Sequence, residues 1–127
     1  MKKIIQTDKA PAPIGPYSQA VLIGDTLYTS GQIALDAESG ELIISTIAEE
    51  THKVMTNMKA VLNAAGMNFE NVVKSSIFLS SMQNFQAVNE VYATCFNESE
   101  APARETVEVS ELPKKVNVEI SMIAVKY

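Results

Sequence analysis

The clearest pattern in the sequence is an apolar stripe with helical spacing between positions 47 and 65. Apolar or small residues recur along it every three or four positions, at Ile47, Thr51, Val54, Met55, Met58, Val61, Leu62 and Ala65. This spacing places them on one face of a helix. Thr46 with Glu49 three residues later has the form of a capping box, and Gly66 suits the position after the last turn. The pattern predicts an amphipathic helix that ends before Gly66.

A second, shorter helix is predicted after a strand at Val72–Leu79. Ser81 suits its N-cap, and Pro102 lies beyond its end. Its apolar stripe is formed by Phe85, Val88, Tyr92, Cys95 and Phe96. We expect Cys95 to pack in the core.

Other segments are rich in β-branched and aromatic residues, which is typical of strands. They are Ile4–Thr7, Ser18–Ile23, Thr26–Ser30, a short candidate at Glu41–Ser45, Arg104–Val109 and Val116–Val125. Gly24-Asp25 predicts a short hairpin connection. Three prolines between positions 11 and 16 predict a stiff extended loop.

The order of these elements, βββ(β)αβαββ, predicts an α+β fold with a mixed sheet and both helices on one face. The 127 residues suffice for one domain, residues 1–127, and leave no room for a second. Along the last strand, one set of alternate side chains is entirely apolar, whereas the other set, which contains Glu119, Ser121, Ile123 and Val125, is half polar. A partner subunit could cover this second face.

Composition and charge exclude several classes of protein. Ten basic against fifteen acidic residues give a net charge of −5, which makes nucleic acid an unlikely partner. The lone cysteine, the lack of a recognisable secretory signal and the lack of any long apolar run favour the cytoplasm and exclude a membrane span. With a single histidine, His52, which we expect to be solvated, and scattered glycines, the sequence predicts no metal site and no cofactor.

Arg104 and Glu119 are the candidates for chemistry. If the last two strands form a hairpin around Leu112-Pro113, Arg104 lies opposite Ser121 and diagonal to Glu119, on the face away from the helices. The ordinary interpretation is an exposed ion pair worth about a few tenths of a kcal/mol. The functional interpretation requires burial in a subunit interface, where the arginine holds a small carboxylate and the glutamate orients or deprotonates a water molecule.

Several short blocks occur in a fixed order between Ile14 and Val125. They are Ile14-Gly15-Pro16-Tyr17-Ser18-Gln19, Ser30-Gly31-Gln32-Ile33, Pro102-Ala103-Arg104, Val107-Glu108-Val109 with Leu112-Pro113, and Val118-Glu119-Ile120 with Ile123-Ala124. Together they resemble the signature blocks of the Rid family, also called the YjgF family, the reactive intermediate deaminases.

The resemblance implies a chorismate-mutase-like fold, a homotrimer whose sheets form a central barrel, and three clefts between subunits. It also implies hydrolysis of 2-iminobutanoate and 2-iminopropanoate to 2-ketoacids and ammonia, without a cofactor. Arg104 would hold the substrate carboxylate and Glu119 would position the water. The resemblance also implies that four residues line the cleft: Tyr17, Ser30, Gly31 and Asn89. Thr106 would provide backbone contacts.

Some positions depart from the family pattern or allow a structural interpretation. Glu105-Thr106 stands where many members have Ser-Cys, and Ser121 stands where a second carboxylate is common, so the preferred imine is open. Tyr17 could anchor its loop, Asn89 could make an ordinary helix-to-loop hydrogen bond, and Ser30-Gly31 could be a strand end with a bulge.

Two other functions compete with deamination. The first is a non-catalytic module that binds 2-ketoacids or similar carboxylates through Arg104. It differs from the enzyme at Glu119, which catalysis requires and binding does not. The second is RNA cleavage, which has been attached to some relatives. The negative charge and the lack of a basic run argue against it.

Overall fold

The helical stripe forms α1 (Ile47–Ala64), with ends close to those predicted. The Thr46 hydroxyl caps it by accepting a hydrogen bond from the Glu49 amide at 3.0 Å. The Glu49 carboxylate accepts a hydrogen bond from the Ser45 hydroxyl, so the capping box is only half formed. Gly66 has φ of 73°, and the amides of Gly66 and Met67 donate back into the last turn, each at 2.9 Å. This Schellman arrangement ends the helix where glycine permits it.

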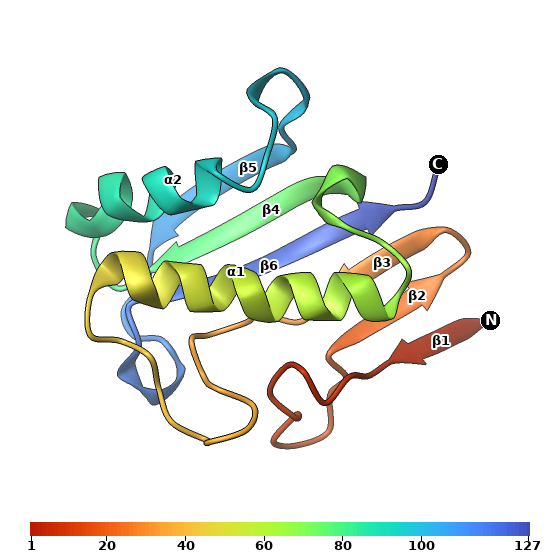
Figure 1. Cartoon of the computed structure of the whole chain (residues 1–127), viewed down its shortest axis with the longest axis horizontal. Helices are drawn as coiled ribbons and strands as arrows, with labels where there is room; N and C mark the ends of the chain where they lie inside the picture. Colours follow the sequence, from red (N-terminus) through yellow and green to blue (C-terminus); the bar gives the residue numbers. More distant parts are fainter.

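Six strands form one mixed sheet behind the helices (Figure 1). The computed structural model describes all residues, 1–127. The strands are β1 (Lys2–Ile5), β2 (Ala20–Ile23), β3 (Thr26–Thr29), β4 (Val72–Leu79), β5 (Ala103–Glu108) and β6 (Val118–Val125), in the spatial order β1-β2-β3-β6-β4-β5. The only parallel pair is β4 with β5, joined through α2 (Phe85–Ala93). The predicted α+β class, with both helices on one face, is confirmed.

The predicted hairpin between the last two strands is wrong. β4 lies between β5 and β6, so Arg104 aligns with Ser75 and Thr106 aligns with Ile77. The prediction paired strands because they follow each other in sequence, which is a tendency and not a rule. Here the helix between β4 and β5 provides the long crossover that a parallel pair requires, and β6 fills the middle of the sheet.

The predicted short strand at Glu41–Ser45 is also wrong. This segment belongs to a loop, where Leu42 makes only an isolated bridge to Leu35. A tight turn of the chain precedes it: the Gly40 amide donates to the Asp36 carbonyl, and Gly40 has φ of 74°. After this turn, the segment pairs with the chain before it at the Leu35–Leu42 bridge alone and does not continue as a ladder of paired strands.

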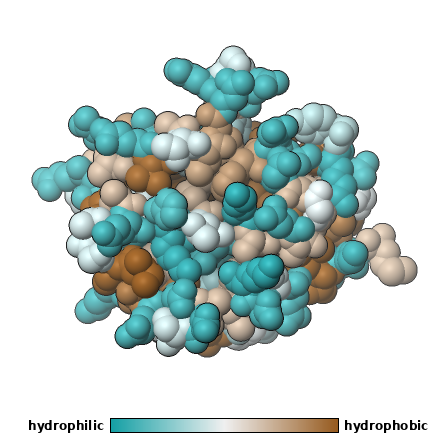
Figure 2. Space-filling view, in the orientation of Figure 1, coloured by the Kyte–Doolittle hydropathy of each residue, from teal (hydrophilic) through white to brown (hydrophobic).

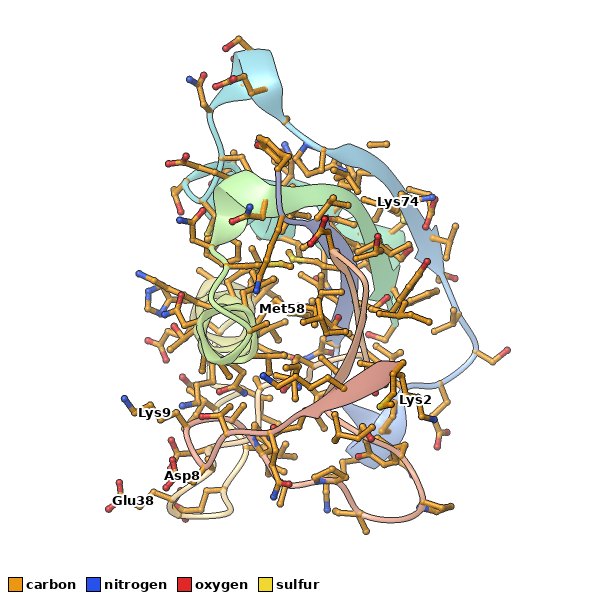
Figure 3. All side chains as sticks on the ribbon, turned by 90° about the vertical axis from the view of Figure 1, so that its right-hand side faces the viewer. Lys2, Asp8, Lys9, Glu38, Met58 and Lys74 are labelled. Carbon is orange, nitrogen blue, oxygen red and sulfur yellow. The ribbon has the colours of Figure 1, made fainter.

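The core fills the space between α1, α2 and the sheet. Met58 lies there between α1 and the sheet, whereas Lys74 lies on the far side of the sheet (Figure 3). The outward surface of the helices carries polar side chains with separate hydrophobic patches (Figure 2). His52 is exposed, and Cys95 is half-buried against the core, where burial raises its thiol pKa. No helix has the length and apolar character of a membrane span.

The opposite face of the sheet has no cover within the chain. One row of aligned side chains on it runs through Ile4, Val21, Tyr28, Ile123 and Lys74. Ile4 and Tyr28 are each 49% exposed. The mixture of apolar and polar side chains that the alternation along β6 predicted is therefore present on this face. An exposed apolar row of this length is typical of a contact surface.

A buried carboxylate attaches α1 to the start of β6. Glu50 is fully buried, and its two oxygens accept hydrogen bonds from the Asn117 side chain at 2.8 Å and from the amides of Asn117 and Val118 at 2.8 and 3.1 Å. These amides begin the strand that carries Glu119. The glutamate thus fixes the position of β6 relative to the helix layer.

We predict that Glu50→Ala lowers the free energy of unfolding by about 2–4 kcal/mol, because three buried or partly buried donors lose their acceptor at once. Chemical denaturation with equal m-values checks this prediction. Glu90→Ala is the control, since Glu90 is an exposed glutamate on α2 with no side-chain hydrogen bond. Equal stability of the two variants would contradict a stabilising role for the hydrogen bonds of Glu50 to Asn117 and Val118.

Candidate active site

Glu119 lies on the uncovered face of β6, directly against Gly31. A Cβ atom on Gly31 would lie 2.0 Å from Glu119 Oε2. Gly31 has no positive φ, so the bulge interpretation is not needed; the glycine makes room for the carboxylate. Glu119 is half-buried, its carboxylate makes no hydrogen bond within the chain, and burial raises its pKa. A carboxylate with a raised pKa is suited to accept a proton near neutral pH.

Ser30 holds the end of β3 beside this glycine. Its hydroxyl donates to the Ser18 carbonyl at 2.5 Å, and its amide donates to the Gln19 carbonyl at 2.9 Å. Both bonds attach the Ser30-Gly31 segment to the chain that leads into β2. Within one chain, the Ser30 hydroxyl is therefore a positioning group for Gly31.

Tyr17 lies at the mouth of a small cavity next to Gly31. It is 53% exposed, and its hydroxyl accepts a hydrogen bond from the Ile14 amide at 3.3 Å. The cavity has a volume of about 230 Å³, and Tyr17, Gly31, Gln32 and Lys114 are among its lining residues. Tyr17 thus anchors its loop and also lines a cavity within the chain, whereas its role in a cleft between subunits stays a prediction.

Arg104 forms a second group of residues with α2. Its Nη1 donates to Asn89 Oδ1 at 2.7 Å. Its guanidinium carbon lies 5.1 Å from the ring centroid of Tyr92 and 5.7 Å from that of Phe85. The remaining guanidinium donors make no hydrogen bond within the chain. Asn89 and the two rings therefore hold a planar fork whose free edge can bind a carboxylate.

The space in front of this fork is a cavity of about 690 Å³, lined by Arg104, Asn89, Tyr92 and other residues. Thr106 follows on the same side of β5. Its hydroxyl oxygen is buried and has no hydrogen-bond partner, a rare condition for a polar atom. Arg104, Asn89 and Thr106 are therefore on one face of the sheet.

Arg104 and Glu119 do not meet within one chain. Arg104 aligns with the buried Ser75 on the helix side of the sheet, whereas Glu119 aligns with Phe78 on the uncovered side. The predicted diagonal contact is therefore wrong, because it depended on the hairpin. The structure instead divides the predicted site into an arginine group and a glutamate group, which holds Glu119, Gly31, Ser30 and Tyr17.

Sequence reasoning missed the aromatic shelf under Arg104. It placed Phe85 and Tyr92 in the core stripe of the second helix. Tyr92 is indeed buried: its hydroxyl donates to Ser75 Oγ at 2.8 Å, and burial raises its pKa. The available signal was the spacing of Phe85, Asn89 and Tyr92 at i, i+4 and i+7, which puts all three on one face.

The departure from the family pattern at Glu105 points away from the arginine group. Its carboxylate forms an ion pair with Lys74 at 2.9 Å and accepts from the Ser76 hydroxyl, on the uncovered face. These contacts lower the pKa of Glu105, the serine hydrogen bond more than the lysine. Within the chain, this substitution therefore alters the uncovered face of the sheet and not the cavity in front of Arg104.

Comparison with known proteins identifies the class to which this fold and these residues belong. A family model described as "Endoribonuclease L-PSP" matches residues 7–126. The chain belongs to the Rid, or YjgF, family.

Its relatives match along nearly their whole length. A RutC family protein of Saccharolobus solfataricus is 52% identical over 99% of both chains. A protein of Bos taurus named 2-iminobutanoate/2-iminopropanoate deaminase is 48% identical over 99% of this chain and 91% of its own. A putative endoribonuclease of Thermotoga maritima superimposes with a TM-score of 0.96 at 50% identity, over 100% of this chain and 99% of its own. The relatives agree on the fold and carry different functional names.

We predict that Gly31→Ala displaces the Glu119 carboxylate and leaves the fold intact. The three atoms nearest to the new methyl group all belong to the flexible Glu119 side chain, and Gly31 has no positive φ that would exclude a side chain. If Glu119 acts as the base in imine hydrolysis, as the family resemblance implies, that activity should fall by about tenfold or more, since a shift of about 1 Å in a catalytic group is costly. The melting temperature should stay close to that of the wild type. Unchanged activity would contradict a role for this contact.

Proposed function

We propose that this chain hydrolyses small 2-imino acids, such as 2-iminobutanoate and 2-iminopropanoate, to 2-ketoacids and ammonia. The observation that carries the proposal is the prepared arginine fork, held by Asn89 and two aromatic rings, together with a half-buried glutamate of raised pKa. Relatives such as the bovine protein, named as deaminases of these imines, support the same chemistry.

The proposal requires a second copy of the chain, because one chain keeps the two groups on opposite faces of its sheet. In a cyclic homotrimer, the arginine group of one subunit can face the glutamate group of the next, which gives three equal sites with closed symmetry. The uncovered sheet face, with its row of apolar side chains, is the surface that such an assembly would bury. This assembly corresponds to the trimeric barrel that the family resemblance implies.

The proposed reaction begins with the substrate carboxylate on the Arg104 fork. Glu119 of the neighbouring subunit accepts a proton from a water molecule as its oxygen attacks C2 of the protonated imine. The resulting tetrahedral carbinolamine takes that proton on nitrogen, and the C–N bond breaks with ammonia as the leaving group. Glu119 accepts the proton of the hydroxyl group as its oxygen becomes the ketone oxygen, and that proton passes to ammonia. The sum is one protonated imine and one water to one 2-ketoacid and one ammonium ion. Tyr17, Gly31 and Thr106 would line the site.

The proposal assigns no role to a metal or cofactor. A protonated imine is already electrophilic, so positioning the water and accepting its proton address the main barriers. RNA, the substrate that the family name Endoribonuclease L-PSP suggests, fits less well. The net charge of −5 opposes binding of a polyanion, whereas one arginine fork suits a single carboxylate.

We predict that Glu119→Gln lowers turnover by about 100-fold or more and leaves 2-ketobutyrate binding within about threefold, because the amide keeps the shape and loses the base. The acid limb of the wild-type pH profile, where rate rises as Glu119 ionises above the ordinary glutamate pKa, should disappear.

Arg104→Lys is the complementary variant. It should weaken binding and turnover together, since lysine lacks the planar fork. If the wild type binds 2-ketobutyrate and does not accelerate hydrolysis of freshly generated imine, the non-catalytic binding module replaces the enzyme.

A subunit-mixing experiment tests where the site is assembled. Arg104→Ala and Glu119→Gln should each be inactive, and joint refolding of equal amounts should recover about a quarter of the activity, because random cyclic assembly pairs an intact arginine with an intact glutamate at one site in four. Light scattering should give the mass of a trimer. No recovery from well-mixed trimers would place both residues in one chain's site and contradict the proposal.

A further inference from the structure

Lys114 lies in a turn that opens onto the cavity beside Tyr17 and Gly31. This turn, Pro113–Lys115, leads directly into β6 and lines the cavity of about 230 Å³ through Pro113 and Lys114. In Figure 1 the turn is in the blue loop below the start of β6. The lysine is therefore on the same side of the molecule as the glutamate group of the candidate site.

The backbone of this turn is in a conformation that favours glycine. Lys114 and Lys115 have φ of 55° and 57°, and they are the only residues other than glycine with positive φ. The buried Leu112 and Val116 anchor the turn on both sides, at 6% and 1% exposure. A turn anchored in this way fixes the backbone from which the Lys114 side chain extends, at a position that the surrounding structure determines.

Lys114 also has no ion-pair partner. The two ion pairs in the chain are Lys53 with Asp36 and Lys74 with Glu105. Lys114, an exposed residue, thus places a positive charge without an ion-pair partner among the residues that line the cavity. In a chain with a net charge of −5, and with Glu119 beside Gly31, it opposes the repulsion that an approaching anion experiences.

We propose that Lys114 is the capture residue for the anionic substrate: its ammonium group attracts the carboxylate of an incoming 2-imino acid toward the cavity beside Gly31. The inference rests on the proposed function and adds a residue that does not take part in bond making. Its contribution is to association, through a long-range charge attraction that salt screens, and not to the chemical step.

The test compares Lys114→Gly with Lys115→Gly. The two variants remove the same charge and relieve the same backbone conformation, so neither should fail to fold. At about 20 mM salt, Lys114→Gly should lower kcat/KM by about 5–10-fold, and the deficit should shrink to about twofold at about 200 mM, while kcat stays unchanged. Lys115→Gly should stay within about twofold of the wild type at both concentrations.

Binding of 2-ketobutyrate, measured by calorimetry at both salt concentrations, gives a readout that is independent of turnover. The dissociation constant should follow the same pattern. If the wild type binds and hydrolyses but the two glycine variants behave alike, or if Lys114→Gly changes kcat alone, the capture role is overturned and the proposed function stands. If the wild type neither binds 2-ketobutyrate nor hydrolyses the imines, both proposals are overturned.

Discussion

The structure depends on the position of β6 in the middle of a sheet that is covered on one face only. Every second residue of β6 faces the helices: Val118, Ile120, Met122 and Ala124 are all nearly fully buried. The intervening residues, which include Glu119, face the uncovered side. Because side chains alternate strictly along a strand, the core and the candidate base are set by the same register. A slip of one residue would bury Glu119 under the helices.

The parts of the fold that local patterns determine could be predicted. α1 begins at the predicted residue, and β4 occupies the predicted range Val72–Leu79. Hydrophobic periodicity, helix caps and helix-ending residues all depend on residues that are close in sequence. The pairing of β5 could not be predicted in this way. It depends on the crossover through α2, and a single sequence does not show which distant strand provides the partner. The error moved Arg104 to the wrong face of the sheet.

The sequence indicated which residues are candidates for the site, but it did not indicate how they are arranged in space. Blocks that resemble the Rid family pointed to Arg104, Glu119, Tyr17 and Gly31. What sequence could not show is that a single chain holds the arginine and the glutamate apart. It also gave no sign of the close contact between Gly31 and Glu119, because a contact between a loop and a distant strand has no periodicity.

Buried polar side chains hold the loops that carry the site. The Gln19 side chain accepts from the Thr7 amide at 2.7 Å and donates to the Pro11 carbonyl at 2.8 Å, which fixes the proline-rich loop before Tyr17. Asn57 on α1 donates to the carbonyls of Ile33 and Leu35, at 3.0 and 2.9 Å, just after Gly31. With irregular backbone satisfied in this way, the loops can present Tyr17 and Gly31 in fixed positions.

The raised pKa of Glu119 links the site to stability. Burial favours the protonated form in the folded chain, so the folded pKa lies above the unfolded value. The resulting stabilisation is present at low pH and is lost as pH rises through the folded pKa, so the ionised carboxylate weakens the fold at neutral pH. Glu50, by contrast, is a buried carboxylate that can accept about four hydrogen bonds and accepts three. These hydrogen bonds support the same strand. Glu50 on α1 therefore stabilises the start of β6, whereas Glu119 on the outer face of the same strand has a half-buried carboxylate whose ionisation costs stability.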